Sequence, residues 1–103
     1  MMDDILRKIV DVIAIGFQPE RIILFGSVAR GENSLESDYD ICVIKKGVKH
    51  KRKFAQEIYK SLYGTKASVD VIVETPERFN ELKDNPYLIY KSISEEGKLI
   101  YEK

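Results

Sequence analysis

Apolar residues at the start of the chain recur at the spacing of an amphipathic helix. Charged residues separate the apolar positions, which are Ile5, Leu6, Ile9, Val10 and Ile13. Residues three and four apart share one face of a helix, so this spacing predicts a first helix that packs one face on a core. Gly16 stands where we expect that helix to end.

Three short runs further along the chain predict the strands of a sheet. Residues 21–25 are almost wholly apolar and too few for a surface helix, which indicates a strand buried on both faces. We expect a second strand over residues 38–44 and a third over residues 68–73. Because side chains alternate along a strand, Asp38 and Asp40 should share one face of the sheet.

A second amphipathic pattern lies between the second and third predicted strands. Phe54, Ile58 and Leu62 repeat every four residues, which places them on one face of a helix. Gly64 follows and suits the left-handed position after a helix. We therefore expect a helix that ends at Gly64.

Capping signals predict the elements of the last quarter of the chain. Thr75-Pro76 and Asn85-Pro86 each place a capping side chain before a proline, so two short helices are expected, the second ending at Gly97. The tail at residues 98–101 could add an edge strand. This order of elements predicts an α/β fold, a short mixed sheet flanked by helices, in one domain over residues 1–103.

The composition is that of a small globular domain. The chain has 103 residues, of which 44% are hydrophobic and 33% are charged. No apolar run approaches the thickness of a bilayer, so no membrane is expected as a partner. Acids stand near the amino terminus, where a secretory signal has positive charge, and we therefore expect a cytoplasmic protein.

The charges balance over the whole chain but not locally. Seventeen basic and 17 acidic side chains give a formal net charge of zero, so nucleic acid is not expected as the main ligand. Residues 45–53, KKGVKHKRK, nevertheless form a basic run that could meet phosphate or an acidic partner surface. The alternative is a solvated loop and helix start, in which His50 is merely exposed. Cys42, the single cysteine, is expected to fill space in its strand.

Acidic side chains gather near a glycine turn of the predicted sheet. Asp38 and Asp40 begin the second strand, ten residues after the pair Gly26-Ser27 that ends the first. Magnesium prefers carboxylate oxygens and completes its shell with water and substrate phosphates. Two metal ions would need a further acid from a neighbouring strand, and Asp70 is the candidate.

Groups suited to phosphate accompany these acids. The absence of a side chain at Gly26 lets the backbone approach a phosphate closely, and the Ser27 hydroxyl can donate a hydrogen bond to it. Arg30 could add a forked cationic contact, although a surface salt bridge is its plainer interpretation. The acids also have plainer interpretations, as solvated residues at a strand end or on an edge strand. The combined spacing favours a shared site.

The motif resembles the signature of the polymerase-beta-like nucleotidyltransferases. It consists of Gly26-Ser27, ten residues, Asp38-Tyr39-Asp40 and the later strand acid Asp70. The string Gly-Ser-Val-Ala-Arg-Gly is similar to that of the minimal nucleotidyltransferase branch of this family. The motif covers residues 25–44, and the order of elements extends the resemblance over about three quarters of the chain.

The resemblance implies both an activity and roles for these residues. Gly26 and Ser27 would bind the nucleotide phosphates, Asp38 and Asp40 would ligate two magnesium ions, and Asp70 would ligate the catalytic ion and act as the base. The implied reaction transfers AMP from ATP to a hydroxyl and releases pyrophosphate. Members this short often pair with a toxin of the HEPN class and adenylylate one of its tyrosines, so the implied partner is such a toxin.

Two other functions remain open at this point. Relatives of this fold transfer nucleotides to small molecules or to RNA ends, and such a transferase would need no protein acceptor. A non-catalytic antitoxin would instead neutralise its toxin by contact alone and use the motif only to hold a nucleotide. The sequence also leaves open whether the chain forms a homo-oligomer.

Overall fold

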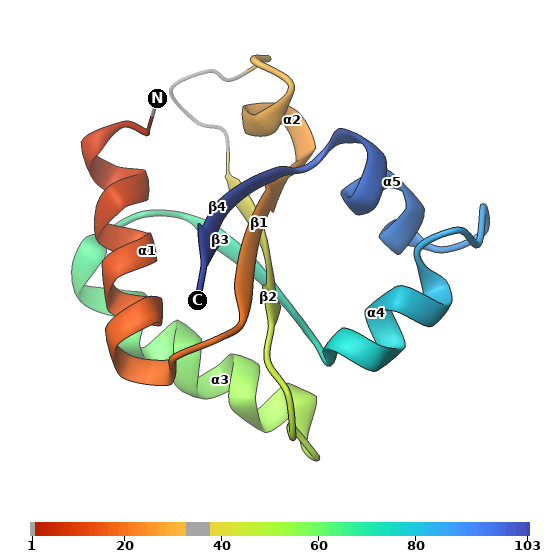
Figure 1. Ribbon diagram of the computed structural model, residues 1–103. Helices are drawn as coiled ribbons and strands as arrows, with labels where there is room; N and C mark the ends of the chain where they lie inside the picture. Colours follow the sequence, from red (N-terminus) through yellow and green to blue (C-terminus); the bar gives the residue numbers. More distant parts are fainter. Residues whose placement is uncertain (1, 33–37) are drawn as a thin grey trace.

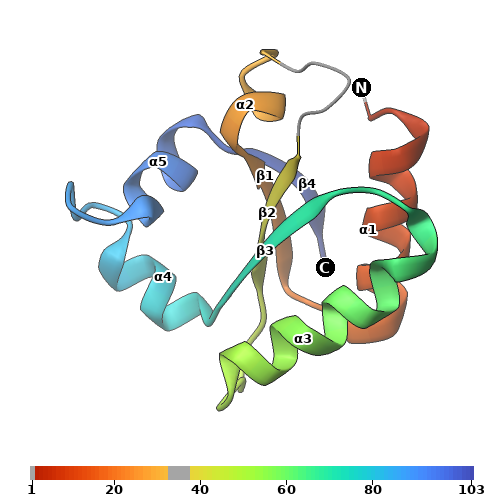
Figure 2. The ribbon, with the colours of Figure 1, turned by 180° about the vertical axis from the view of Figure 1, so that it is seen from behind.

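The structure is a computed structural model that describes residues 2–32 and 38–103. A four-stranded sheet separates two layers of helices (Figure 1), as the view from behind also shows (Figure 2). The elements in chain order are α1 (Asp4–Phe17), β1 (Arg21–Phe25), α2 (Gly26–Ala29), β2 (Tyr39–Ile44), α3 (Lys51–Leu62), the 3-10 turn η1 (Tyr63–Thr65), β3 (Val69–Glu74), α4 (Pro76–Leu82), α5 (Ile89–Glu96) and β4 (Lys98–Glu102).

The sheet is mixed, as the sequence predicts. Its strand order is β3-β2-β1-β4, with β1 antiparallel to both of its neighbours and β2 parallel to β3. Parallel neighbours need a crossover connection, and α3 supplies it between β2 and β3. The expected edge strand near the carboxyl terminus is confirmed as β4, which pairs with β1.

Both faces of the sheet carry a core, so the central strands are buried on both sides. On β1, Ile22 and Leu24 pack into the cluster under α1 and α3, whereas Ile23 and Phe25 pack under α4 and α5. Asp40 of β2 shares the α4 and α5 face with Cys42, which is completely buried. Burial raises the pKa of the Cys42 thiol to about 12, as expected for a residue that only fills space.

Of the three helix ends predicted at glycines, the one at Gly97 is confirmed for α5, whereas those at Gly16 and Gly64 are displaced. Helix α1 continues through Phe17, whose ring packs edge-to-face on Phe54 at a centroid distance of 5.4 Å, and Gln18 takes the left-handed conformation at φ 48°. Helix α3 ends at Leu62 and passes into η1, so the left-handed residue is Lys66 at φ 59°. Packing beyond the glycine prolongs α1, and the 3-10 turn shifts the end of α3.

Of the two helix starts predicted near the carboxyl terminus, one is confirmed and the other is wrong. Thr75 caps α4, because its hydroxyl accepts a hydrogen bond from the Arg78 amide at 3.3 Å. Asn85 instead forms a turn in which its side chain accepts from the Tyr87 amide at 2.9 Å, and α5 begins only at Ile89. The proline after Asn85 therefore belongs to a loop.

One apolar residue of α1 is more exposed than expected. Ile5 was expected on the buried face of α1 but is 46% exposed, because the core face is formed by Leu6, Ile9, Val10 and Ile13.

None of the helices in residues 2–32 and 38–103 is both long enough and apolar enough to cross a membrane.

Candidate active site

A tight turn at the end of β1 places the chain directly against an acidic side chain of β2. Gly26 begins α2 with φ 75°, a conformation that favours glycine. A β-carbon on Gly26 would overlap the Asp40 carboxylate, so the space also demands glycine. Phe25 pairs with Asp40 across the antiparallel strands, which holds this turn over the carboxylate.

Two carboxylates face each other across parallel strands beneath this turn. Asp40 of β2 and Asp70 of β3 are direct register partners, and both alternate with residues that face α1 and α3. Neighbouring strands lie about 4.8 Å apart, so paired side chains on one face are adjacent. The Asp40 side chain is half-buried and that of Asp70 is exposed. The site therefore opens to solvent on the β3 side.

Electrostatics in this pair favour the binding of a cation. Burial raises the pKa of Asp40, and so do the nearby charges of Asp70 and Asp38 and a hydrogen bond with Asp70; the charge of Arg30 opposes the rise. The fold thus holds the Asp40 carboxylate close to two other carboxylates at a cost in electrostatic energy. A divalent cation would relieve the repulsion between these carboxylates and lower the pKa of Asp40 again.

Asp38 sits at the mouth of the site, just before β2. Its carboxylate accepts a hydrogen bond from the Ser68 hydroxyl, and the Tyr39 amide donates to the Ser68 carbonyl at 2.9 Å. Sequence reasoning missed Ser68, because its closeness to Asp38 depends on the register of β2 against β3, which the sequence does not show. Ser68 orients Asp38 from the residue directly before β3, the strand that carries Asp70. Residues 33–37, which belong to the motif, lie outside the described residues.

The side chains as they stand do not form a complete metal cage. Within residues 2–32 and 38–103, no group of three or more Asp, Glu, His or Cys side chains is arranged to hold a metal ion. The donor set still fits magnesium, because this ion takes one or two carboxylates and leaves other positions to water and substrate phosphates. Asp40 and Asp70 can supply those carboxylates, and Asp38 would join them by turning from Ser68.

Arg30 follows the short helix and has a partner on its own loop. Its guanidinium forms a salt bridge with Glu32, and both side chains are largely exposed. The hydrogen bond and charge of Glu32 raise the pKa of Arg30, with smaller contributions from Glu96 and Asp40. The salt bridge that the sequence left as the plainer interpretation is thus present, while the charge of Arg30 still reaches Asp40.

Comparison with known proteins decides the family. The family model described as "Polymerase beta, Nucleotidyltransferase" matches residues 7–103. The chain belongs to this family of nucleotidyltransferases. A relative from Methanocaldococcus jannaschii, named "Putative protein adenylyltransferase MJ0604", is 34% identical over 82 residues, which are 80% of this chain and 78% of the relative. The nucleotidyltransferase class expected from the motif is thereby confirmed.

Solved structures show the same fold. The crystal structure of a "putative nucleotidyltransferase" from Sulfolobus solfataricus superposes with a TM-score of 0.63 at 24% identity, over 96% of this chain and 78% of that one. A crystal structure described as "the toxin-antitoxin with AMP-PNP" gives a TM-score of 0.63 at 21% identity, over 94% of this chain and 73% of that one. The expected polymerase-beta-like fold is confirmed.

Proposed function

We propose that this nucleotidyltransferase transfers AMP from ATP to a tyrosine hydroxyl of a partner protein, a toxin of the HEPN class, and so acts as an antitoxin. The observation that carries the proposal is the placement of Gly26 against Asp40, with Asp70 as the register partner of Asp40. A phosphate chain that follows the Gly26 turn would meet both carboxylates. The name of the Methanocaldococcus jannaschii relative and the toxin–antitoxin structure with a bound ATP analogue support the acceptor class.

The reaction is a displacement at the α-phosphorus of ATP. The tyrosine oxygen forms a new bond to this phosphorus while the bond to the β,γ-pyrophosphate breaks. Asp70, which is more exposed than Asp40, takes the hydroxyl proton, and pyrophosphate leaves toward the Gly26-Ser27 turn. Asp38, Asp40 and Asp70 would hold magnesium, and Gly26, Ser27 and Arg30 would contact the phosphates. Bound magnesium ions would activate the attacking oxygen and neutralise charge on the leaving group.

Positioning by the strands explains why so few residues suffice. Phosphoryl transfer depends mainly on orientation and on electrostatic stabilisation, not on covalent chemistry by the protein. β2 and β3 fix the two central acids by backbone pairing, and the Gly26 turn fixes the nucleotide side of the site. The tyrosine must then be presented by the partner at the open side near Asp70.

The test uses ATP labelled at the α-phosphate, magnesium and a co-purified HEPN toxin, followed by separation of labelled proteins. We expect label on the toxin, and we expect Asp38→Asn/Asp40→Asn to reduce its rate by about 100-fold or more. Asp11→Asn on the exposed side of α1 is the matched control and should label at the wild-type rate. Mass spectrometry should place one or more AMP groups on tyrosine.

Two results would contradict the proposal. Neutralisation of the toxin by the Asp38→Asn/Asp40→Asn variant, without label, would indicate inhibition by contact. Transfer of label to a small molecule or an RNA end at a higher rate than to protein would agree with nucleotide transfer but would contradict a protein acceptor. Both results leave the assignment to the nucleotidyltransferase family intact, because that rests on the family match.

A further inference from the structure

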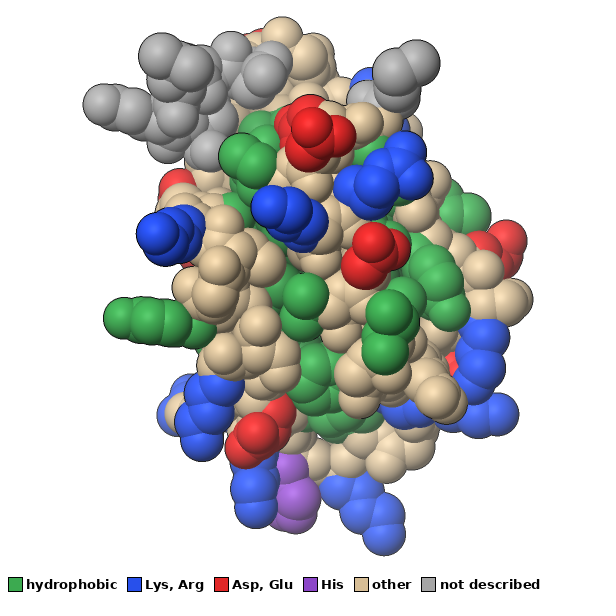
Figure 3. All heavy atoms as spheres, turned by 90° about the vertical axis from the view of Figure 1, so that its left-hand side faces the viewer, with side chains coloured by type: hydrophobic (Ala, Val, Ile, Leu, Met, Phe, Trp, Pro, Cys, Tyr) green, Lys and Arg blue, Asp and Glu red, His purple; other side chains and the backbone are tan. Residues whose placement is uncertain are grey.

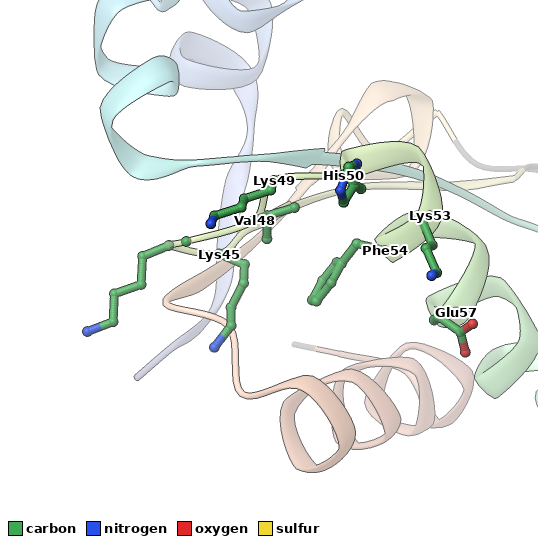
Figure 4. A pocket seen from close by; sticks show the side chains of 9 residues that line it. Lys45, Val48, Lys49, His50, Lys53, Phe54 and Glu57 are labelled. Carbon is green, nitrogen blue, oxygen red and sulfur yellow. The ribbon is translucent and has the colours of Figure 1, made fainter.

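A basic hollow lies at the end of the sheet opposite the candidate active site. It is lined by the loop that leaves β2 and by the first turns of α3, and its volume is about 370 Å³ (Figure 4). The lining residues are Lys45, Lys46, Gly47, Val48, Lys49, His50, Lys53, Phe54 and Glu57. Lys45 directly follows β2 and lies five residues beyond Asp40, which separates the hollow from the acids by about 17 Å of extended chain.

The positive charge of this hollow is only partly balanced by neighbouring acids, because Glu57 is the one acid in its lining and Glu20 interacts with Lys45 and Lys46 at its rim. In the described part of the chain, no carboxylate oxygen lies within 4.0 Å of the side-chain nitrogens of Lys49, Arg52 or Lys53. The first turn of α3 contains no acidic residue, so the lysines add to the positive end of the helix dipole instead of offsetting it. The lining therefore keeps an excess of positive charge that a bound anion would offset.

The rim of the hollow is held rigidly. The Lys46 amide donates to the Glu20 carboxylate at 2.7 Å, which is the main reason that the pKa of Glu20 is lowered. The Lys45 ammonium donates to the Gln18 carbonyl at 3.1 Å, and the Glu20 amide donates to the Ile44 carbonyl at 2.8 Å. A preformed surface loses little conformational entropy on binding, which favours its use for recognition.

The floor of the hollow is apolar. Val48 and Phe54 are both half-buried, and Phe54 points from α3 toward α1, where it meets Phe17 (Figure 4). A ligand that fits this surface therefore combines an aliphatic or aromatic side chain with neighbouring anionic groups. In the space-filling view, the single histidine lies among Lys and Arg side chains at this end of the molecule (Figure 3).

We propose that the basic hollow binds an acidic segment of a partner protein, with one apolar side chain seated on Val48 and Phe54 and its carboxylates between Lys46, Lys49 and Lys53. A peptide fits better than nucleic acid, because Phe54 is half-buried and packs against Phe17, so the surface it leaves suits a single side chain better than a stacked base. The zero net charge of the chain also lacks the general field that draws nucleic acid. This surface goes beyond the proposed adenylylation, and its test reads binding alone.

The test measures binding of a fluorescent peptide of glutamates with one central leucine, by anisotropy and by amide shifts in NMR spectra. We expect shifts centred on residues 46–54 and an affinity that falls as salt is raised. Lys49→Glu/Lys53→Glu should weaken binding about tenfold or more. Arg7→Glu/Lys8→Glu on α1 reverses the same number of exposed charges and should bind as wild type. Circular dichroism establishes that both variants fold.

Control probes decide between this proposal and its rivals. A peptide with glutamine in place of glutamate should bind about tenfold more weakly or worse, and so should a peptide with serine in place of leucine. Equal binding by the Lys49→Glu/Lys53→Glu variant would overturn the proposal. Tighter binding of an oligouridylate than of the acidic peptide would overturn it in favour of RNA, and absence of binding by every probe at low salt would overturn it outright.

Discussion

Gly26 stands so close to Asp40 that any β-carbon at this position would overlap the carboxylate. The contact joins the end of β1 to the start of β2. It places the backbone of the turn directly over the carboxylates of Asp40 and Asp70. A glycine in a nucleotide-binding turn is often explained by its conformation alone. Here the positive φ and the lack of space are separate demands, and they can be separated by experiment.

The first prediction compares two glycines with the same backbone angle. Gly26 has φ 75° beside Asp40, whereas Gly31 has φ 78° and no heavy atom of the described residues within 4 Å of the position that a β-carbon would take. Gly31→Ala should lower the free energy of unfolding by about 1 kcal/mol through strain at positive φ. Gly26→Ala should lower it by about 2–4 kcal/mol, because overlap adds to strain. Urea unfolding measures both, and equal losses would contradict the close contact.

The second prediction concerns the repulsion between Asp40 and Asp70. A carboxyl whose pKa is raised by folding destabilises the protein above its unfolded pKa, so the pair opposes folding at neutral pH. Asp70→Asn should remove transfer activity yet raise the free energy of unfolding by about 0.5–1 kcal/mol. It should also lower the pKa of Asp40, which carbon NMR of the carboxyl can follow.

Magnesium provides the control for this prediction. If the two acids share a cation site, added magnesium should raise the melting temperature of the wild type and much less that of Asp70→Asn. Asp11→Asn, at an exposed position on α1, should respond to magnesium as the wild type does. A less stable Asp70→Asn protein at neutral pH would show that the pair is not repulsive.

The alternation of the strands made the acidic face predictable. The period of two placed Asp38, Asp40 and Cys42 on one side of β2, and the structure has Cys42 in the core under α4 and α5. The register of β2 against β3 could not be predicted, since it depends on how α3 returns the chain. The sequence therefore does not predict that Asp40 pairs directly with Asp70, and the structure shows it.

Local signals failed where tertiary contacts overrode them. Neither Gly16 nor Gly64 adopts the left-handed conformation expected at a helix end. Gln18 and Lys66 take that conformation instead. The hydrogen bond from Ser68 to Asp38 joins residues 30 positions apart, and no pattern along the chain encodes such a contact.

A third prediction concerns the free edge of the sheet at β3. The Val71 amide donates to the Tyr59 hydroxyl at 2.8 Å, so a side chain of α3 occupies a backbone donor that would otherwise face solvent or another strand. Tyr59→Phe should lower the free energy of unfolding by about 0.5–1.5 kcal/mol and accelerate hydrogen exchange of the Val71 amide. Tyr63→Phe, at a residue that is 88% exposed, is the matched control and should change neither quantity.

The last prediction concerns Glu74, a buried acid at the end of β3 whose side chain is only 3% exposed. Burial raises its pKa, but hydrogen bonds from Lys51 (2.6 Å), Tyr90 (2.7 Å) and the Thr75 amide (3.0 Å) outweigh burial and lower the pKa below its ordinary value of 4.5. A lowered pKa means that the ionised form stabilises the fold above pH 4.5 and that this stability is lost as the pH falls through the folded value.

Glu74→Gln should therefore be less stable than the wild type at neutral pH, by about 1–3 kcal/mol, because the half-exposed Lys51 loses its partner within the polar cluster. The difference should shrink as the pH falls below 4.5 and through the folded pKa of Glu74, where the wild-type carboxyl becomes protonated as well. Urea unfolding of both proteins across this range measures it, with Glu77→Gln on the exposed side of α4 as the matched control. A difference that stays constant with pH would show that the glutamine is poorly packed and that the charge of Glu74 contributes nothing. Because Glu74 lies on the same strand as Asp70, four residues beyond it, the ionised cluster also fixes the strand that carries the proposed base.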